Sequence, residues 1–412
     1  MSGIKIINDP IYGFIKIPSE RIFRLIEHPF FQRLRRIRQL GMTHLVYPGA
    51  QHTRFQHALG AMHLMGEAID VLRSKGHDIS DAEAEAVRIA ILLHDVGHGP
   101  FSHALEDSIV RGIKHEELSE LIMDRLNQDF NGELSLAIKI FKNEYPKRFL
   151  HQLVSSQLDV DRLDYLNRDS FYAGVTEGII SSDRIIKMLE VHNDELVIEA
   201  KGIYSIEKFI VARRLMYWEV YLHKTVVSAE CLLINILKRA KELMKQEKDV
   251  PATPALVKFL SVNFNKPDFI STPALLDTFA ELDDTDVSAA VKLWSKHPDR
   301  ILSILCNGMI NRKLFKIIIQ NDPFNKNVLN EINEKVKADL KLNDDELTYF
   351  ILEGKLTNNA YNIESDRIKI LYKDGSIKDI AEAADTLNIQ ALSKPVEKYY
   401  ICFPKMNWTF SS

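Results

Sequence analysis

The sequence has few cysteines and little excess charge of either sign. Its three cysteines, Cys231, Cys306 and Cys402, lie far apart in a chain of 412 residues, so they form neither a CxxC zinc or redox pair nor a disulfide framework. The chain has 53 Lys and Arg residues against 57 Asp and Glu residues, a formal net charge of -4. This balance argues against a protein whose whole surface binds nucleic acid or anionic lipid, but it allows a local basic pocket.

Long apolar runs are also missing. No segment approaches the ~20 consecutive apolar residues that a membrane-spanning helix needs. The start, MSGIKIINDP, lacks the basic segment and the long apolar stretch of a secretory signal. With the scarce cysteines, these absences predict a cytoplasmic protein without a membrane partner.

Helical periodicity dominates residues 19–237. Thr53 and Gln56 have the spacing of a capping box and predict the start of a helix, and residues 82–94 predict a second, buried helix that Gly97 ends. Residues 203–237 predict one long helix or two.

Strands are expected only near the two ends of the chain. Residues 4–7 and 13–17 predict short strands around an Asn8-Asp9-Pro10 turn, and residues 368–372 and 398–403 predict further strands. We therefore expect a mostly α fold with a smaller α+β C-terminal region, divided into residues 1–245 and residues 246–412.

Histidines are concentrated in one part of the sequence. Nine of the fourteen lie between His44 and His115, and both metal binding and proton transfer near neutral pH favour imidazole. His94 and Asp95 end the predicted buried helix, where such side chains are costly unless they are paired or bind a metal. Neighbours on a helix point about 100° apart, so a cation that both side chains bind would lie beyond the helix end.

Two other segments offer further ligands. His57 lies inside the helix that Thr53 caps, and Asp161 lies in a charged segment, residues 158–169. On a helix Asp161 and Tyr165 share one face, so this segment could offer a carboxylate to a metal and the arginine of position 162 to phosphate. The alternative for so many charges is a solvated helix.

Four motifs follow one another in a specific order: HTRFQHALG (52–60), HDVGHGPFSH (94–103), KHEE (114–117) and LDVDRLDYLNRD (158–169). Together they resemble the HD superfamily of phosphohydrolases, specifically its deoxynucleoside triphosphate triphosphohydrolase branch. The resemblance covers a little over half of the chain, from Lys5 to about Ala229. It implies that residues 1–245 form an HD-domain helical core with an N-terminal hairpin and a regulatory segment.

The resemblance also implies a divalent metal held by His57, His94, Asp95 and Asp161. Two imidazoles and two carboxylates leave coordination positions for water and a phosphate oxygen. Manganese, magnesium, iron, zinc and nickel all suit this ligand set, and the sequence does not choose among them.

Proton carriers are predicted next to the metal ligands. In the enzymes that the sequence resembles, the histidine matching His98 lies beside the attacked phosphorus, and the one matching His103 acts in acid/base catalysis with an acidic neighbour, here Glu106. His115 and Glu116 match a further pair that lines the site. For His103 and His115 the alternative is a hydrogen-bonded structural histidine.

A triphosphate carries about four negative charges, so its pocket should contain several cations. Taken alone, the stripe of Arg213, Tyr217 and Tyr221 is more often core packing with a snorkelling arginine. The resemblance implies a substrate-binding role for a larger set of residues: Gln39, Leu40, Arg54, Arg162, Tyr165, Asp169, Arg213, Tyr217 and Tyr221. Arg162 and Tyr217 stand where the family often has Lys and His, which leaves fine substrate choice open.

Lys5, Asn8, Gln32 and Arg35 match the region that binds an activating nucleotide between subunits in regulated members of the family. The resemblance therefore implies a homo-oligomer, a tetramer or a dimer, assembled by nucleotide. The alternative is that FFQRLRRIRQL, residues 30–40, is a basic amphipathic helix packed on its own core.

We expect metal-dependent hydrolysis of deoxynucleoside triphosphates to deoxynucleoside and inorganic triphosphate. The alternatives are an HD phosphodiesterase or nucleotidase that acts on other nucleotides, and a nucleotide sensor without catalysis. The preferred dNTP, the activator, the native metal and the role of the C-terminal region stay open.

Overall fold

The computed structural model describes residues 5–101, 110, 112–364, 367–385, 392 and 394–405. Helices make up most of the described chain. Its N-terminal half contains the following elements: β1 (Ile6–Asp9), β2 (Gly13–Lys16), α1 (Glu20–Glu27), α2 (Pro29–Gln32), η1 (Arg33–Arg36), η2 (Gly41–Leu45), α3 (Arg54–Ser74), α4 (Asp81–Leu93), α6 (His115–Asp129), α7 (Ser135–Phe141), α8 (Arg148–Val154), α9 (Val160–Ala173), α10 (Ser182–Lys187), β3 (Leu189–His192), β4 (Glu195–Glu199), η4 (Ala200–Gly202), α11 (Ile203–Met216), η5 (Tyr217–Tyr221) and α12 (Lys224–Lys245).

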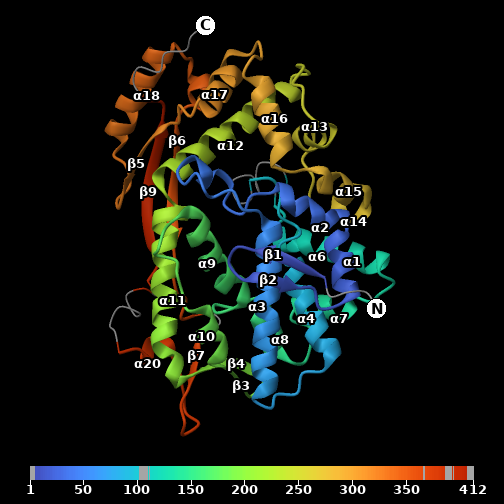
Figure 1. The fold of residues 1–412 in the computed structure, drawn as a ribbon. Helices are drawn as coiled ribbons and strands as arrows, with labels where there is room; N and C mark the ends of the chain where they lie inside the picture. The colour runs from blue at the N-terminus through green and yellow to red at the C-terminus, as the bar shows by residue number, and fades with distance from the viewer. Residues whose placement is uncertain are drawn as a thin grey trace.

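Helices α3, α4 and α9 form the centre of this half, where α3 packs against both of the others (Figure 1). The Thr53 backbone N–H donates to the Gln56 side chain at 2.8 Å, and Ser80 and Glu83 form the same capping box at the start of α4. These caps satisfy N–H groups that a helix start leaves without partners. The predicted helix start at Thr53 is confirmed, and so is the predicted helix over residues 82–94, which His94 caps at its C-terminal end.

The glycine after α4 lets the chain pass close to α6. A Cβ atom at Gly97 would collide with the backbone of His115, Leu118 and Ser119. The Gly97 N–H instead donates to the Ser119 hydroxyl at 2.9 Å, and that hydroxyl donates to the His94 carbonyl oxygen at 2.7 Å. The end of α4 and the start of α6 are thereby held together.

The segment predicted as one helix or two forms α11, a π-helical turn (η5) and α12. Among the described residues, no single helix is both long and apolar enough to cross a membrane, and only the segments Ala200–Tyr221 and Lys224–Lys245 reach that length and composition when taken together, with a bend of 54° between them.

The C-terminal part of the described chain adds further helices, some of which lie above α12 in Figure 1, and strands that belong to two sheets. Its elements are α13 (Pro254–Ser261), α14 (Lys266–Ser271), α15 (Ala274–Glu281), α16 (Asp284–Trp294), α17 (Arg300–Ile310), β5 (Lys316–Gln320), α18 (Lys326–Leu340), α19 (Asp344–Leu347), β6 (Leu352–Asn358), β7 (Lys369–Leu371), β8 (Ile377–Asp379), α20 (Ile380–Ala383) and β9 (Val396–Phe403).

Strand β9 is the centre of an antiparallel sheet with the order β5-β9-β6, and β5 packs on α12. A second sheet has the order β3-β4-β7-β8, in which β4 and β7 run parallel with Ile198 opposite Ile370. The C-terminal region therefore completes a sheet that begins in the N-terminal half. The division at residue 245 stays a prediction.

The N-terminal hairpin and the strands at 368–372 and 398–403 are confirmed, with β1 at Ile6–Asp9 and residue 4 outside the described residues. The mostly α fold is confirmed, but the hairpin β3-β4 interrupts the region in which helical periodicity dominates, and the sequence did not predict this hairpin or the strands β5, β6 and β8. Most of these strands are three to five residues long, too short to show an alternating pattern that differs from a helix turn.

Gly60 on α3 should be essential for stability because α9 approaches it closely. A Cβ atom there would collide with the Asp164 carboxylate and the Arg168 guanidinium, whereas at Gly66 on the same helix the nearest atom is Arg88 Nε at 3.4 Å. We expect Gly60→Ala to lower the free energy of unfolding in urea by about 1–3 kcal/mol. The matched Gly66→Ala should raise it by about 0.5–1 kcal/mol through helix propensity. Equal effects of the two substitutions would contradict this packing.

Candidate active site

A cavity of about 430 Å³ lies where α3, α4, α9 and the segment from η5 to α12 meet. Most of the residues predicted to bind metal, substrate or protons lie in its wall. The wall consists of Gln39, Leu40, Gly41, Thr43, Arg54, Asp95, His98, Phe101, His115, Asp161, Arg162, Tyr165, Asp169, Tyr217, Tyr221, Leu222 and Glu230.

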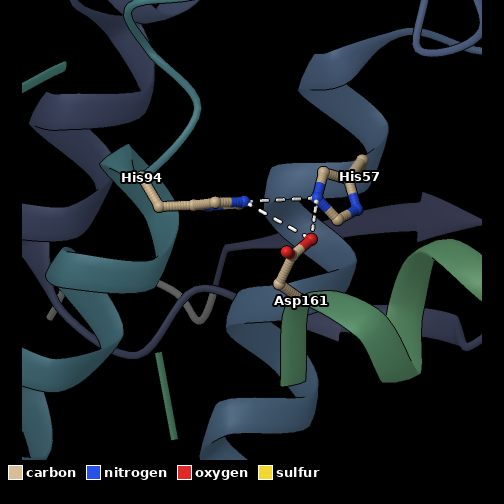
Figure 2. Close-up of side chains that lie close together, drawn as sticks. All are labelled: His57, His94 and Asp161. Atoms are coloured by element: carbon tan, nitrogen blue, oxygen red, sulfur yellow. Dashed lines mark hydrogen bonds and ion pairs between the residues drawn. The ribbon is translucent and has the colours of Figure 1, made fainter. Parts of the chain in front are cut away.

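Three of the four predicted metal ligands converge beside this cavity. His57 on α3, His94 at the end of α4 and Asp161 on α9 each offer one ligand atom, and these atoms lie within 4.8 Å of one another. Figure 2 shows the three side chains pointing toward a common point from three helices. The His57 Nε2 atom lies 3.1 Å from Asp161 Oδ1 and 3.4 Å from His94 Nε2.

Hydrogen bonds orient both imidazoles for metal binding. His57 Nδ1 donates to Asp164 Oδ2 at 2.7 Å, and His94 Nδ1 donates to the Ile91 carbonyl oxygen at 2.6 Å. Each ring then keeps its Nε2 lone pair for a cation, the arrangement typical of histidines that bind metal. The ligand types and their orientation therefore fit a divalent metal, which would be held by His57, His94 and Asp161 with Asp95 beside them.

The charges around this point also fit a cation. Burial lowers the pKa of His57, but hydrogen bonds to Asp161 and Asp164 outweigh it and raise the pKa to about 10. Burial also disfavours the charged form of Asp161 and so raises its pKa. Hydrogen bonds from His57 and His94 outweigh this effect and bring the pKa of Asp161 below its ordinary range. The buried carboxylates thus attract positive charge, and a metal ion would satisfy them with the imidazoles neutral.

The fourth predicted ligand, Asp95, lies between this group and a second one. Its Oδ1 atom is 3.3 Å from His94 Nε2 and 3.2 Å from His98 Nε2, and its Oδ2 atom accepts a hydrogen bond from Arg54. Asp95, His98 and His115 form a second cluster with metal-ligand spacing. Asp95 therefore connects the predicted metal ligands to the predicted proton carriers.

His98 is held neutral against the ring of His115. The two rings stack with centroids 3.8 Å apart and an interplanar angle of 19°. Burial and the nearby Arg54 guanidinium lower the pKa of His98 well below its ordinary value. A neutral His98 can donate to Asp95 from Nε2 without adding positive charge to the site.

The opposite wall of the cavity is aromatic. Asp169 accepts from the Tyr221 hydroxyl at 2.8 Å and from His52 Nε2 at 2.7 Å. The rings of Tyr165 and Tyr217 each meet Tyr221 edge to face, with centroids 6.2 and 5.2 Å away. The side-chain oxygen of Gln39 is buried and accepts no hydrogen bond within the described part of the chain.

Two of the three predicted arginines line the cavity. Arg54 contacts Asp95, and Arg162 donates from Nε to the Ser156 carbonyl oxygen at 2.8 Å. Arg213 does not line it and instead donates to the Ala360 carbonyl oxygen at 3.1 Å. Its predicted substrate contact stays a prediction.

The remaining predicted residues are more scattered. Glu116 is exposed beside His115 at 3.5 Å, and His103 and Glu106 lie outside the described residues. The four predicted regulatory residues are outside this cavity wall, with their contacts as follows: Lys5 pairs with Glu20 at 3.5 Å, Asn8 is exposed on β1, Gln32 accepts from Arg35 at 2.9 Å, and Arg35 stacks on Phe55 at 3.6 Å.

The sequence analysis missed the groups that support the metal ligands. Asp164 binds His57 and also accepts from Arg168 at 2.9 and 3.0 Å, and Arg168 donates to Asp9 at 2.7 Å. Asp164 follows Asp161 by three residues, so the helical spacing could have indicated it. His52, which binds Asp169, was given no role, although it begins the first motif.

Asp164 should determine how tightly the metal is held. Asp164→Asn removes the carboxylate that orients His57, so we expect metal affinity to fall roughly 10- to 100-fold. The measurement is equilibrium dialysis against Mn²⁺, and the matched control is Asp70→Asn at an exposed position of α3. Both variants need circular dichroism spectra like that of the unchanged protein. An unchanged Mn²⁺ dissociation constant in folded Asp164→Asn would contradict the proposed support.

Comparison with protein families places two models on this chain. The HD domain matches residues 54–169 and the HD associated region matches residues 180–255. The first match contains α3, α4 and most of α9, the helices of the metal group, and the second contains α11 and α12.

Similar proteins cover most of the chain or a little over half of it. A phosphohydrolase from Bacteroides thetaiotaomicron has a crystal structure that is 57% identical in sequence, with a TM-score of 0.94 over 98% of this chain and 100% of that chain. The Bacillus subtilis protein YwfO is 32% identical over 98% of this chain and 93% of its own length. The deoxynucleoside triphosphate triphosphohydrolase SAMHD1 homolog of Dictyostelium discoideum is 33% identical over 58% of this chain and 50% of its own length. This chain belongs to the HD superfamily of phosphohydrolases.

Proposed function

We propose that the protein hydrolyses deoxynucleoside triphosphates to deoxynucleoside and inorganic triphosphate. The observation that carries the proposal is one cavity whose wall combines two predicted metal ligands, two arginines and three tyrosines. A divalent metal bound at His57, His94 and Asp161 would polarise a phosphoryl oxygen and lower the pKa of an attacking water. The similarity to proteins named deoxynucleoside triphosphate triphosphohydrolase supports the substrate class.

The protein's own groups would position the substrate. Arg54 and Arg162 would bind the phosphate chain, since guanidinium groups form strong paired hydrogen bonds with phosphate. The buried, unpartnered side-chain oxygen of Gln39 would accept a hydrogen bond from a sugar hydroxyl, and Asp169 lies in the same wall. The tyrosines would cover the apolar face of the sugar and the base.

Proton transfer is assigned to the histidines beside Asp95. His98 stays neutral and would lie beside the attacked phosphate group, oriented by its contact with Asp95 and by the stacked ring of His115. The proton for the leaving oxygen would come from His103 with Glu106, as the family resemblance implies.

Nucleotide activation is the second part of the proposal. Lys5, Asn8, Gln32 and Arg35 would bind an activating nucleotide between subunits of a tetramer or dimer. Arg35 is exposed and bonded to Gln32, so the pair offers a cation and an amide side by side. A cytoplasmic location belongs to the same proposal, because dNTPs occur there.

A product assay tests the reaction itself. Purified protein incubated with each dNTP, alone and in pairs, with Mn²⁺ or Mg²⁺ should release inorganic triphosphate and deoxynucleoside in equal amounts. Pairs are included because the activator can differ from the substrate. Release of pyrophosphate or orthophosphate in place of triphosphate would exclude cleavage of the bond between the 5′ oxygen and the α-phosphorus, and absence of any product under all conditions would reject the enzyme.

Arg162 separates this proposal from hydrolysis of nucleoside monophosphates or cyclic nucleotides. Loss of a charged hydrogen bond to the phosphate chain in Arg162→Ala should reduce kcat/KM for dNTPs roughly 10- to 100-fold. The control is Arg184→Ala, an exposed arginine on α10 that donates to the Lys201 carbonyl oxygen. Equal activity of the two variants on dNTPs would favour the alternative substrates.

A further inference from the structure

Glu230 on α12 has no role in the proposed chemistry, although its side chain lines the same cavity. Within the described chain, no group hydrogen-bonds or ion-pairs with its carboxylate. The other acidic residues of the wall all have partners: Asp95 contacts Arg54, Asp161 contacts His57, and Asp169 accepts from Tyr221. Among the described residues, Glu230 is therefore the acidic side chain of this wall for which no partner is found.

An unpartnered carboxylate in a cavity is costly. Burial alone raises the pKa of Glu230 to about 7. A glutamine or a leucine would avoid this cost, so stability does not explain a glutamate at this position. A ligand that donates hydrogen bonds to the carboxylate would remove the penalty when it binds.

The position of Glu230 indicates which part of a ligand it meets. The metal group and the two arginines come from α3, α4 and α9, whereas Glu230 comes from α12, which packs on η2, the helix of Thr43. Tyr217, Tyr221 and Leu222 precede it and lie in the same wall. If the phosphate chain lies at the arginines, as the proposed function requires, the far end of the nucleotide faces α12.

We propose that Glu230 recognises guanine, and that the cavity prefers dGTP among the dNTPs. The guanine edge carries two adjacent donors, the N1–H and the 2-amino group, which match the two oxygens of one carboxylate. Adenine and cytosine offer one amino donor beside a ring nitrogen acceptor, and thymine offers one N–H between two carbonyl oxygens. These acceptors would repel an ionised carboxylate, so Glu230 selects for guanine by attraction and against the other bases by repulsion.

The test compares dGTP with dITP, which lacks the 2-amino group, and with the three other dNTPs. In the unchanged protein, kcat/KM should be highest for dGTP and lower for dITP. In Glu230→Gln, an N–H₂ group replaces one acceptor, so kcat/KM for dGTP should fall on the order of 10- to 100-fold. The values for dATP, dCTP and dTTP should stay the same or rise. Glu242→Gln, the same change on the same helix beside Arg239, should leave the order of the substrates unchanged.

Equilibrium binding of dGTP, dITP and dATP in the presence of EDTA separates this inference from the proposed reaction. Weaker dGTP binding by Glu230→Gln, without turnover in either protein, would reject the reaction and keep the guanine site. If Glu230→Gln hydrolyses dNTPs with the same order of substrates as the unchanged protein, the guanine site is rejected and the reaction is kept. If Glu230→Gln does not fold, as judged by circular dichroism, Glu230→Ala, which removes both acceptor oxygens, gives the comparison for dGTP. If the unchanged protein shows neither turnover of dNTPs nor binding of dGTP, both the reaction and the guanine site are rejected.

Discussion

The hydrogen bond from His57 Nδ1 to Asp164 Oδ2 ties α3 to α9 inside the core, 2.7 Å long between two fully buried side chains. Asp164 can stay ionised there because Arg168 donates to both of its oxygens, and Arg168 is in turn neutralised by Asp9 at the end of β1. Each charged side chain in this buried network has a partner of opposite charge, and such pairing is the condition for a charge to stay ionised inside a protein. Gly60 makes the approach of the two helices possible, since any larger residue would collide with the pair.

This network fixes the face that α9 turns toward the cavity. Once Asp164 points at α3, helical geometry directs Asp161 to the metal group, while Arg162, Tyr165 and Asp169 line the cavity. One short helix thus offers a metal ligand, a phosphate-binding cation, an aromatic ring and a second carboxylate in a fixed order. The Asp159 side chain caps the helix by accepting from the Arg162 N–H at 2.8 Å, so the first turn is held in place as well.

Local signals in the sequence were sufficient for the helices that carry the site. The capping residues Thr53 and Gln56 and the end of the apolar helix before Gly97 are local features, and the described structure contains both. Contacts between distant segments could not be predicted from such local signals. The family resemblance, not the spacing, implied a substrate contact for Arg213, and neither could reveal that this side chain donates to the backbone of Ala360. The role of Asp164 was hidden for a related reason, because a charged helix is solvated unless another helix covers it.

The central claim is that imidazoles and carboxylates from three distant parts of the chain bind one cation. Anomalous diffraction at the manganese absorption edge, from crystals grown with Mn²⁺, tests it most directly. The account predicts one strong peak within bonding distance of His57 Nε2, His94 Nε2 and Asp161 Oδ1, with Asp95 as a further ligand or immediate neighbour. A peak elsewhere in the molecule with none at these atoms, or no peak at saturating Mn²⁺, would contradict it.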